Sequence, residues 1–499
     1  MEKILGREFL KFQEILEELE YIKYTLNGLM VWDNLINLPE DGFEYRKKVM
    51  NYFVKEYYRK ISMMEFKRGY QKLENKKEKS QEERAILRNL KKELEFVYKI
   101  PIKEYGEYLN FLTEIEEEWK IAKEKDDYSK VKKKLETVYD MLRNFTNYLD
   151  KNRESYETLL HKYEKNISIK DLEEIIKSLK LELLPILKNI PQLERDKLIL
   201  NSQESNKQLE LSKEIMKELG FSMKKGRVDM GSYPTTLNNA SSDVRVITTF
   251  SKDILAGVYN TLHETGKGLY EQGIDKNLLG SFLAETPSQI LNEAVAKIYE
   301  NRIGRSREYA SILLKKIKSY FPQFKDIDEN KFYQIINRVE KNPIRIEADE
   351  LSYNFHIILR YELEKELLEE KLKFEDLYSE SQKKYKKYLD IELQNESEGV
   401  LQDVHWVSGY IGFFPIYIVA DIVGAQIINQ FEKEVDSLGE IIKKEKLQLL
   451  KEWLEEKIFK YGSLYDFEEI LLRVTGENIN PKYYIDYMKN KYKTLYKIN

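Results

Sequence analysis

The sequence predicts a mainly α-helical protein with one small β-hairpin sheet. Only 10 prolines and 21 glycines interrupt its 499 residues, so long helices can run without a break. Charged stretches carry apolar residues at helical spacing, for example from Leu172 to Leu187. The segment between Gly226 and Phe250 instead contains the β-branched and aromatic residues that are typical of strands.

The composition fits a soluble globular protein, with 34% charged and 42% hydrophobic residues. The formal net charge of −4 is nearly balanced. A nucleic-acid-binding protein would show a clear basic excess, so we do not expect one. There is no cysteine, and any metal must therefore be bound by His, Asp or Glu. We expect a single domain over 1–499, with a helical part (1–200) before the part that holds the functional motifs (201–499).

We expect neither secretion nor membrane insertion. Residues 1–6 contain no apolar signal segment. The longest uncharged apolar stretch lies between His405 and Asp421 and contains Pro415. It is shorter than the roughly 18–20 residues that span a bilayer, so we interpret it as a buried core helix. The expected location is cytoplasmic.

The candidate strands lie in the first half of the motif-bearing part. Gly226-Arg227-Val228-Asp229 forms one candidate, and Val244 to Phe250 forms the other. Between them, Thr236 to Ser242 is polar and is predicted to be a turn. Helix is predicted again from about Asp253 onward.

The most informative stretch is His263-Glu264-Thr265-Gly266-Lys267, on a helix predicted over 253–272. It is the H-E-x-x-H motif with its last histidine replaced by lysine. In the intact motif, histidines four residues apart share one helix face and bind a metal, while the glutamate activates a metal-bound water. A gluzincin-type site takes its third ligand from a glutamate on the next helix, where Glu293 lies. These positions predict Glu264 as the catalytic residue and His263 and Glu293 as metal ligands, with Lys267 at the remaining ligand position.

Lys267 argues against a working metal site. Neutralising a lysine at pH 7 costs about 4–5 kcal/mol, because its reference pKa is about 10.4. A charged ammonium repels a divalent ion and is favoured by neighbouring carboxylates. We therefore predict that Lys267 ties Glu264 and Glu293 into a buried ion network and replaces the charge of the metal. The alternative is a working site with altered metal coordination.

Several motifs, in order and over essentially the whole chain, carry a resemblance to a known family. Its H-E-x-G-H-x-x-Y-E-Q matches His263 to Gln272 apart from Lys267, and its I-R-x-x-A-D-E matches Ile344 to Glu350. Its G-x-x-Q-D-x-H-W matches Gly399 to Trp406, and its H-E-S-Q stands at Asn292 to Val295. The chain resembles the carboxypeptidase Taq family of helical metallocarboxypeptidases.

The resemblance implies a large helical, gluzincin-like metallopeptidase fold with a deep groove. It also implies a homodimer, a Zn or Co divalent ion, and peptide C-termini as binding partners. In the family, metal-bound water attacks the last peptide bond of a substrate with a free carboxyl end, and Glu264 would be the general base.

The departures from the family pattern cluster where metal and substrate would lie. The family's H-P-F reads Tyr233-Pro234-Thr235 here, and D-x-R-x-T-T-R loses a threonine at Ile247 and an arginine at Thr249. We therefore expect a divergent member with a degraded metal motif and weak or absent metal binding. Two hypotheses stay open: an impaired or inactive homologue, that is, a pseudoenzyme, and an active metallocarboxypeptidase with altered metal coordination.

Arginines are the candidates for gripping the substrate's terminal carboxylate, which a carboxypeptidase must recognise through a paired or bidentate cation. Arg345 and Arg245 are predicted to bind substrate, with Arg360 as a further candidate. The alternative for each arginine is a structural salt bridge, to Asp349, Asp243 and Glu362, respectively.

The aromatic side chains His405 and Tyr417 complete the predicted substrate-binding set, with a structural role as the alternative for each. The chain has only four histidines. His161 is expected on the surface and His356 in the core, so neither compensates for the histidine lost at position 267.

Overall fold

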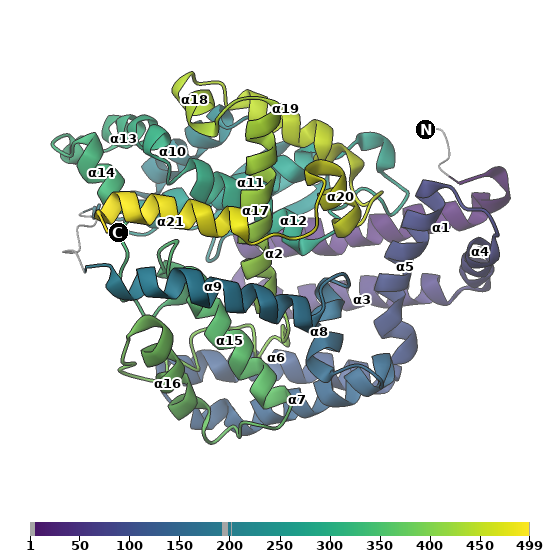
Figure 1. Cartoon of the computed structure of the whole chain (residues 1–499). Coiled ribbons are helices and arrows are strands. Elements are labelled where there is room, and N and C mark those ends of the chain that lie inside the picture. Colours follow the sequence, from purple (N-terminus) through teal and green to yellow (C-terminus); the bar gives the residue numbers. More distant parts are fainter. Residues whose placement is uncertain (1–4, 192–197, 201, 499) are drawn as a thin grey trace. The chain divides into compact units, whose positions relative to one another are not determined.

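The computed structural model describes residues 5–191, 198–200 and 202–498, and it confirms a mainly helical fold with a small sheet (Figure 1). The chain divides into two compact units, each assembled from three separate segments. The first unit combines Met1–Lys91, Asp196–Ile336 and Ile427–Asn478, and the second combines Lys92–Arg195, Asn337–Gln426 and Ile479–Asn499. The single domain expected over 1–499 stays a prediction.

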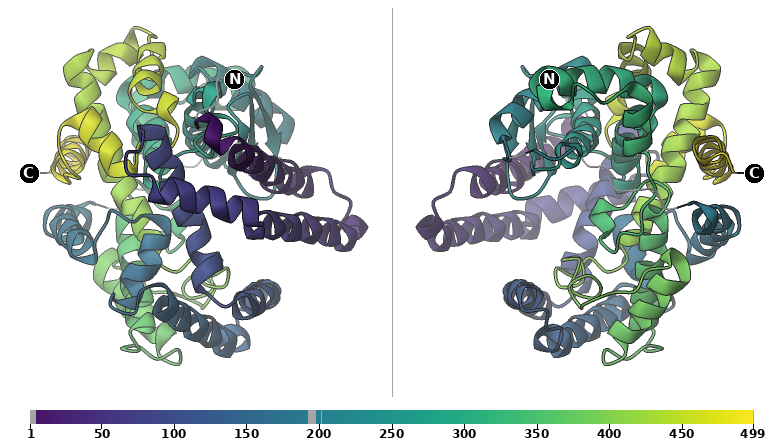
Figure 2. Two further views of the ribbon diagram at one scale, coloured as in Figure 1. Left: turned by 90° about the vertical axis from the view of Figure 1, so that its right-hand side faces the viewer. Right: turned by 90° about the vertical axis from the view of Figure 1, so that its left-hand side faces the viewer.

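The first unit holds the sheet and the helix with the H-E-x-x-K motif. Its helices of six or more residues are α1 (Leu10–Lys23), α2 (Val31–Ile36), α3 (Phe43–Ser62), α4 (Met64–Asn75), α10 (Ser205–Glu218), α11 (Ile254–Gly273), α12 (Gln289–Lys297), α13 (Arg307–Tyr320), α14 (Glu329–Ile336), α18 (Leu438–Lys443), α19 (Gln448–Lys457) and α20 (Phe467–Thr475), with π-helical segments η2 (Tyr24–Met30) and η5 (Ile298–Ile303). Helices α1 and α3 lie side by side, joined through η2 and α2 (Figure 2).

The second unit is helical throughout its described elements. It contains α6 (Ile102–Glu124), α7 (Ser129–Asp150), α8 (Ser155–Tyr163), α9 (Ile169–Asn189), α15 (Tyr353–Leu368), α16 (Leu377–Leu389) and α21 (Lys482–Tyr496), while α5 (Gln81–Lys99) and α17 (Phe414–Glu434) include residues of both units. The long amphipathic helices expected before residue 200 are confirmed. Helices α6 and α7 form an adjacent pair (Figure 2).

Helix α17 contains much of the apolar stretch that was interpreted as a core helix. Its most apolar window is 83% buried, as expected for a core helix. The helix begins at Phe414, so the residues from His405 to Phe413 lie outside it. Pro415 is tolerated because it falls in the first turn, where a backbone N–H has no helical acceptor. By length and hydropathy alone, α17 is the one helix in the described part of the chain that could cross a membrane.

The sheet has three strands in the order β1-β3-β2: β1 (Gly226–Met230), β2 (Thr235–Ala240) and β3 (Asp243–Thr248). A hairpin is present, but it joins β2 to β3; the two strands expected to form it, here β1 and β3, pair in parallel instead. The predicted turn over Thr236–Ser242 is wrong, because most of it is β2 and only Ser241 and Ser242 separate the strands. Asparagine disfavours strands intrinsically, and here contacts from β2 to α11 override that preference.

Helix α11 begins and ends within one residue of the predicted range. The side chain of Asp253 accepts a hydrogen bond from Leu255 N and so caps the helix. The helix packs against β3, β2, α10 and α12. Its burial on several sides fixes the orientation of the motif side chains.

Candidate functional site

The backbones of α11 and α12 approach closely at Gly266. A Cβ atom on this residue would lie 2.7 Å from Ala296 Cα and 2.8 Å from the carbonyl oxygen of Val295. Only glycine allows this approach, because the neighbours are backbone atoms that cannot turn away. The approach brings Glu293 of α12 against the α11 face that carries His263 and Lys267.

Two carboxylates hold the imidazole of His263. Its Nε2 lies 3.2 Å from Glu293 Oε2, and its Nδ1 lies 2.8 Å from Glu300 Oε2. Glu300 lies in η5, which continues α12 with a π-helical turn, a feature frequent at functional sites. Sequence reasoning missed Glu300, although its position seven residues after Glu293 would place both on one helix face.

Lys267 completes the contacts of Glu293. Its Nζ lies 2.6 Å from Glu293 Oε1, so one oxygen of this carboxylate faces the ammonium and the other faces the imidazole. The predicted pair of Lys267 with Glu293 is confirmed. Lys297 extends the network through a 3.0 Å contact with Glu300. Lys267, Glu293, His263, Glu300 and Lys297 thus form a chain, called here the α11–α12 ion network.

Glu264 is 3% exposed, and its Oε2 accepts a 2.6 Å hydrogen bond from the hydroxyl of Thr236 on β2. Thr236, another site residue that sequence reasoning missed, fell in the segment expected to be a turn. The predicted tie between Glu264 and Lys267 stays a prediction.

The network shifts the pKa values of its members strongly. Burial and the charge of Lys267 oppose protonation of His263, but Glu293 and Glu300 outweigh them and raise its pKa to about 9. Burial disfavours ionised Glu293, yet Lys267 and His263 hold the pKa of that carboxyl well below its usual range. Lys297 and His263 lower the pKa of Glu300 in the same way. At neutral pH, the arrangement favours an imidazolium between two carboxylates.

Arg245, predicted to bind substrate, is engaged on the sheet of the first unit. Its guanidinium pairs with Asp243 at 3.0 Å and lies 4.5 Å from the ring centroid of Trp32. Arg227, its register partner on β1, stacks on the same ring at 4.8 Å. The salt bridge that was the structural alternative for Arg245 is therefore present, and cation–π contacts join α2 to the sheet.

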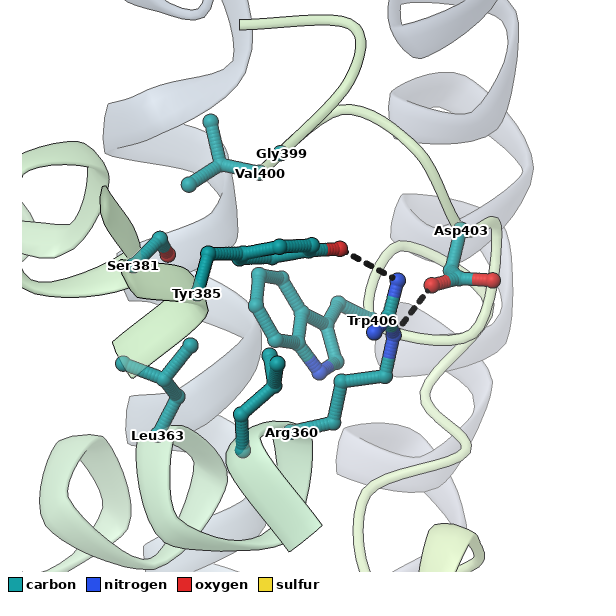
Figure 3. A pocket seen from close by; sticks show the side chains of 9 residues that line it. Arg360, Leu363, Ser381, Tyr385, Gly399, Val400, Asp403 and Trp406 are labelled. Atoms are coloured by element: carbon teal, nitrogen blue, oxygen red, sulfur yellow. Dashed lines mark hydrogen bonds and ion pairs between the residues drawn. The ribbon is translucent and has the colours of Figure 1, made fainter. Parts of the chain in front are cut away.

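In the second unit, Arg345 and Arg360 share the carboxylate of Asp403. Arg345 Nη2 lies 2.8 Å from Oδ1, and Arg360 Nε lies 2.5 Å from Oδ2. Figure 3 shows Asp403 and Tyr385 both bonded to the Arg360 guanidinium. Burial opposes ionisation of Asp403, but the two guanidiniums hold the pKa of that carboxyl well below its usual range.

The salt-bridge partners that the sequence suggested for these arginines are not the ones observed. Arg345 pairs with Asp403 where Asp349 was expected. Arg360 also pairs with Asp403, while Glu362 binds Lys180 and Lys384. Partners close in sequence were the default assumption, whereas Asp403 lies 58 residues from Arg345 and 43 residues from Arg360 within the same segment of the second unit.

His405 lies in an aromatic cluster of the second unit. Its ring stacks on Phe414 at 4.6 Å, and Tyr417 lies 6.4 Å away, edge-on. Burial and the charge of Arg345 lower the pKa of His405 to about 4. Its Nδ1 is buried and has no hydrogen-bond partner in the described part of the chain. His405 and Tyr417 are thus neighbours, and their roles in substrate binding stay predictions.

The fold and the motif helix define a class, that of helical metallopeptidases with an H-E-x-x-H-derived site. The chain belongs to the carboxypeptidase Taq (M32) metallopeptidase family, whose pattern matches residues 11–492. It is 33% identical to Carboxypeptidase 1 of Bacillus subtilis, over 97% of this chain and 98% of the relative. It is 29% identical to Thermostable carboxypeptidase 1 of Pyrococcus furiosus, over 93% and 94% of the two chains.

Solved structures agree with this membership. The M32 carboxypeptidase of Deinococcus radiodurans superposes with a TM-score of 0.94 at 25% identity, covering 99% of this chain and 100% of the other. The Pyrococcus furiosus carboxypeptidase also has a TM-score of 0.94, at 27% identity, covering 98% and 99%. The expected family and fold are confirmed.

The family is one of metallopeptidases, and the predicted metal ligands His263 and Glu293 contact protein groups here. Glu293 Oε1 and both ring nitrogens of His263 contact charged groups of the α11–α12 ion network, whereas Glu293 Oε2, 3.2 Å from His263 Nε2, is buried and has no hydrogen-bond partner among the described residues. An ammonium stands at the remaining ligand position. Across the described ranges, no group of three or more His, Asp or Glu side chains is arranged to hold a metal ion.

Proposed function

We propose that this protein keeps the M32 carboxypeptidase fold while the Lys267 ammonium takes the place of the catalytic metal, so that peptide hydrolysis is strongly impaired or lost. One observation carries the proposal: Glu293, the predicted metal ligand, is shared between Lys267 at 2.6 Å and His263 at 3.2 Å. A divalent ion would have to displace both contacts and overcome repulsion from the ammonium.

A second candidate is an active metallocarboxypeptidase with altered metal coordination. It is supported by Glu264, which is buried, hydrogen-bonded to Thr236 and placed where the family motif has its general base. If Glu264 had no remaining function, nothing would require it to keep its buried position and its hydrogen bond to Thr236.

Release of C-terminal residues separates the two candidates. Purified protein is incubated with a set of N-blocked peptides, with added Zn²⁺ or Co²⁺ and with chelator, beside an active M32 carboxypeptidase as positive control. The proposal predicts at most a small fraction of the release seen with the positive control. Release at the level of the positive control that requires added metal and disappears in chelator would support the second candidate and reject the first.

Peptide binding without cleavage is the activity we propose for the retained fold, with peptides that carry a free carboxyl end as the ligands. Binding is measured by calorimetry with a peptide and its C-terminal amide. A preference for the free acid supports the proposal, and equal or absent binding of both contradicts it. Assembly as a homodimer and a cytoplasmic location are further proposals, and light scattering tests the first of them.

A further inference from the structure

A second buried carboxyl, that of Glu271, lies on α11 about two turns beyond His263. Glu271 is 6% exposed. Its Oε1 accepts a 3.1 Å hydrogen bond from Asn292 Nδ2 of α12, and its Oε2 contacts Asn238 Nδ2 of β2. One side chain therefore joins the three elements that build the candidate site.

These contacts lie next to the contacts of the site itself. Asn292 immediately precedes Glu293, which binds Lys267 and His263. Asn238 lies two residues after Thr236, so both side chains point to the same face of β2. That face meets α11 at Glu271 and again at Glu264.

We propose that Glu271 is a positioning residue of this site: by bonding Asn238 and Asn292, it fixes β2 and α12 on α11, and so places Thr236 at Glu264 and Glu293 at Lys267. The inference concerns the geometry of the site and does not depend on whether the site cleaves peptides. Its failure and the failure of the proposed function are therefore separate results.

The surroundings of Glu271 favour a neutral carboxylic acid. Burial, reinforced by the negative charge of Glu285, raises its pKa to about 8, although the two asparagine amides act in the opposite direction. Asn238 Oδ1 is buried and has no partner among the described residues. Because the two ends of an amide are interchangeable at the level of heavy atoms, the amide can present Oδ1 to a protonated Glu271, whose O–H then donates to it.

Two substitutions of similar size test the proposal. Glu271→Gln keeps an acceptor for Asn292 and a donor for Asn238, as the neutral acid does. Glu271→Met removes both bonds. The readout is the pair of ring N–H signals of His263 in NMR spectra, because these signals report its two carboxylate partners.

Glu364→Met is the matched control. Glu364 is fully buried, its pKa is also raised to about 8 by burial, and it bonds Tyr156 and Trp406 in the second unit.

We expect Glu271→Gln to keep the His263 signals at their wild-type shifts, Glu271→Met to shift or broaden them, and Glu364→Met to leave them unchanged. If Glu271→Met does not fold, Asn292→Ala removes only the bond to α12 and is expected to shift the same signals. A folded Glu271→Met or Asn292→Ala protein with wild-type His263 signals overturns the proposal, and so does a Glu271→Gln protein that behaves like Glu271→Met.

Discussion

Lys267 Nζ lies 2.6 Å from Glu293 Oε1, across the interface between α11 and α12. In an H-E-x-x-H peptidase, these two positions would both be metal ligands. Here the two positions hold a cation, Lys267, and an anion, Glu293, which bind each other directly. In the proposed function, this ammonium supplies the positive charge that a metal ion would otherwise bring.

Replacing Lys267 by histidine is expected to restore part of the metal affinity. The change removes the ammonium and supplies the missing imidazole, so Zn²⁺ affinity should rise at least about tenfold, or about 1.4 kcal/mol. Peptidase activity should stay low, because Tyr233 and Thr249 also depart from the family pattern. Calorimetric titration with Zn²⁺ and the peptide-release assay measure the two effects.

Lys297→His is the control for this experiment. Lys297 belongs to the same network but contacts Glu300, on the far side of His263 from Glu293. The Lys297→His substitution should therefore not raise Zn²⁺ affinity. Activity at the family level after Lys267→His alone would show that the other departures are incidental.

His263 is expected to be an imidazolium at pH 7.5, whereas the other three histidines are neutral. Glu293 and Glu300 raise its pKa to about 9, and burial lowers the pKa values of His161, His356 and His405. Since the folded-state pKa lies above the unfolded value of about 6.5, the stabilisation is complete below pH 6.5 and is lost as the pH rises through 9. NMR titration of the ring nitrogens checks both points, and a neutral His263 at pH 7.5 contradicts them.

Gly266→Ala is expected to destabilise the protein by about 1–3 kcal/mol, because the new Cβ overlaps the backbone of α12. The control is Gly106→Ala on α6, where a Cβ meets nothing within 4 Å. There, the better helix propensity of alanine should stabilise by up to about 1 kcal/mol. Denaturant unfolding measures both changes. An equal effect at the two glycines would show that the close approach at Gly266 is unimportant.

Asp403→Asn is expected to cost about 3–5 kcal/mol of stability, because it leaves the buried guanidiniums of Arg345 and Arg360 without their shared carboxylate. Asp390→Asn serves as the control, since Asp390 is exposed and pairs with Lys341 and Lys386 on the surface. Its effect on unfolding should be too small to measure. If Asp403→Asn is equally mild, Arg345 is available to bind a substrate carboxylate instead.

The sequence could predict those features of the site that depend on local spacing. Asp253 caps α11 within one residue of the expected start, and the pairing of Lys267 with Glu293 follows from the motif and the next helix. Glu300 was not predicted: it lies seven residues after Glu293, but on a π-helical turn that the expected α-helical spacing does not include.

Contacts between residues distant in sequence were the least predictable part of the site. Thr236 reaches Glu264 because a segment rich in asparagine is held as a strand against α11. Asp403 replaces the nearby carboxylates as the partner of two arginines, because the chain folds back within the segment Asn337–Gln426 and brings it to both guanidiniums. Tertiary packing decides both contacts, and no local pattern encodes them.

Metal content tests the central claim most directly. The protein is equilibrated with excess Zn²⁺ or Co²⁺ at pH 7.5, dialysed against metal-free buffer and analysed by mass spectrometry for bound metal, with Lys267→His and an active M32 carboxypeptidase treated in parallel. The Lys267–Glu293 pair predicts far less than one metal ion per chain in the wild-type protein and a higher content in Lys267→His. Near-stoichiometric metal in the wild-type protein would contradict the replacement of the metal by Lys267.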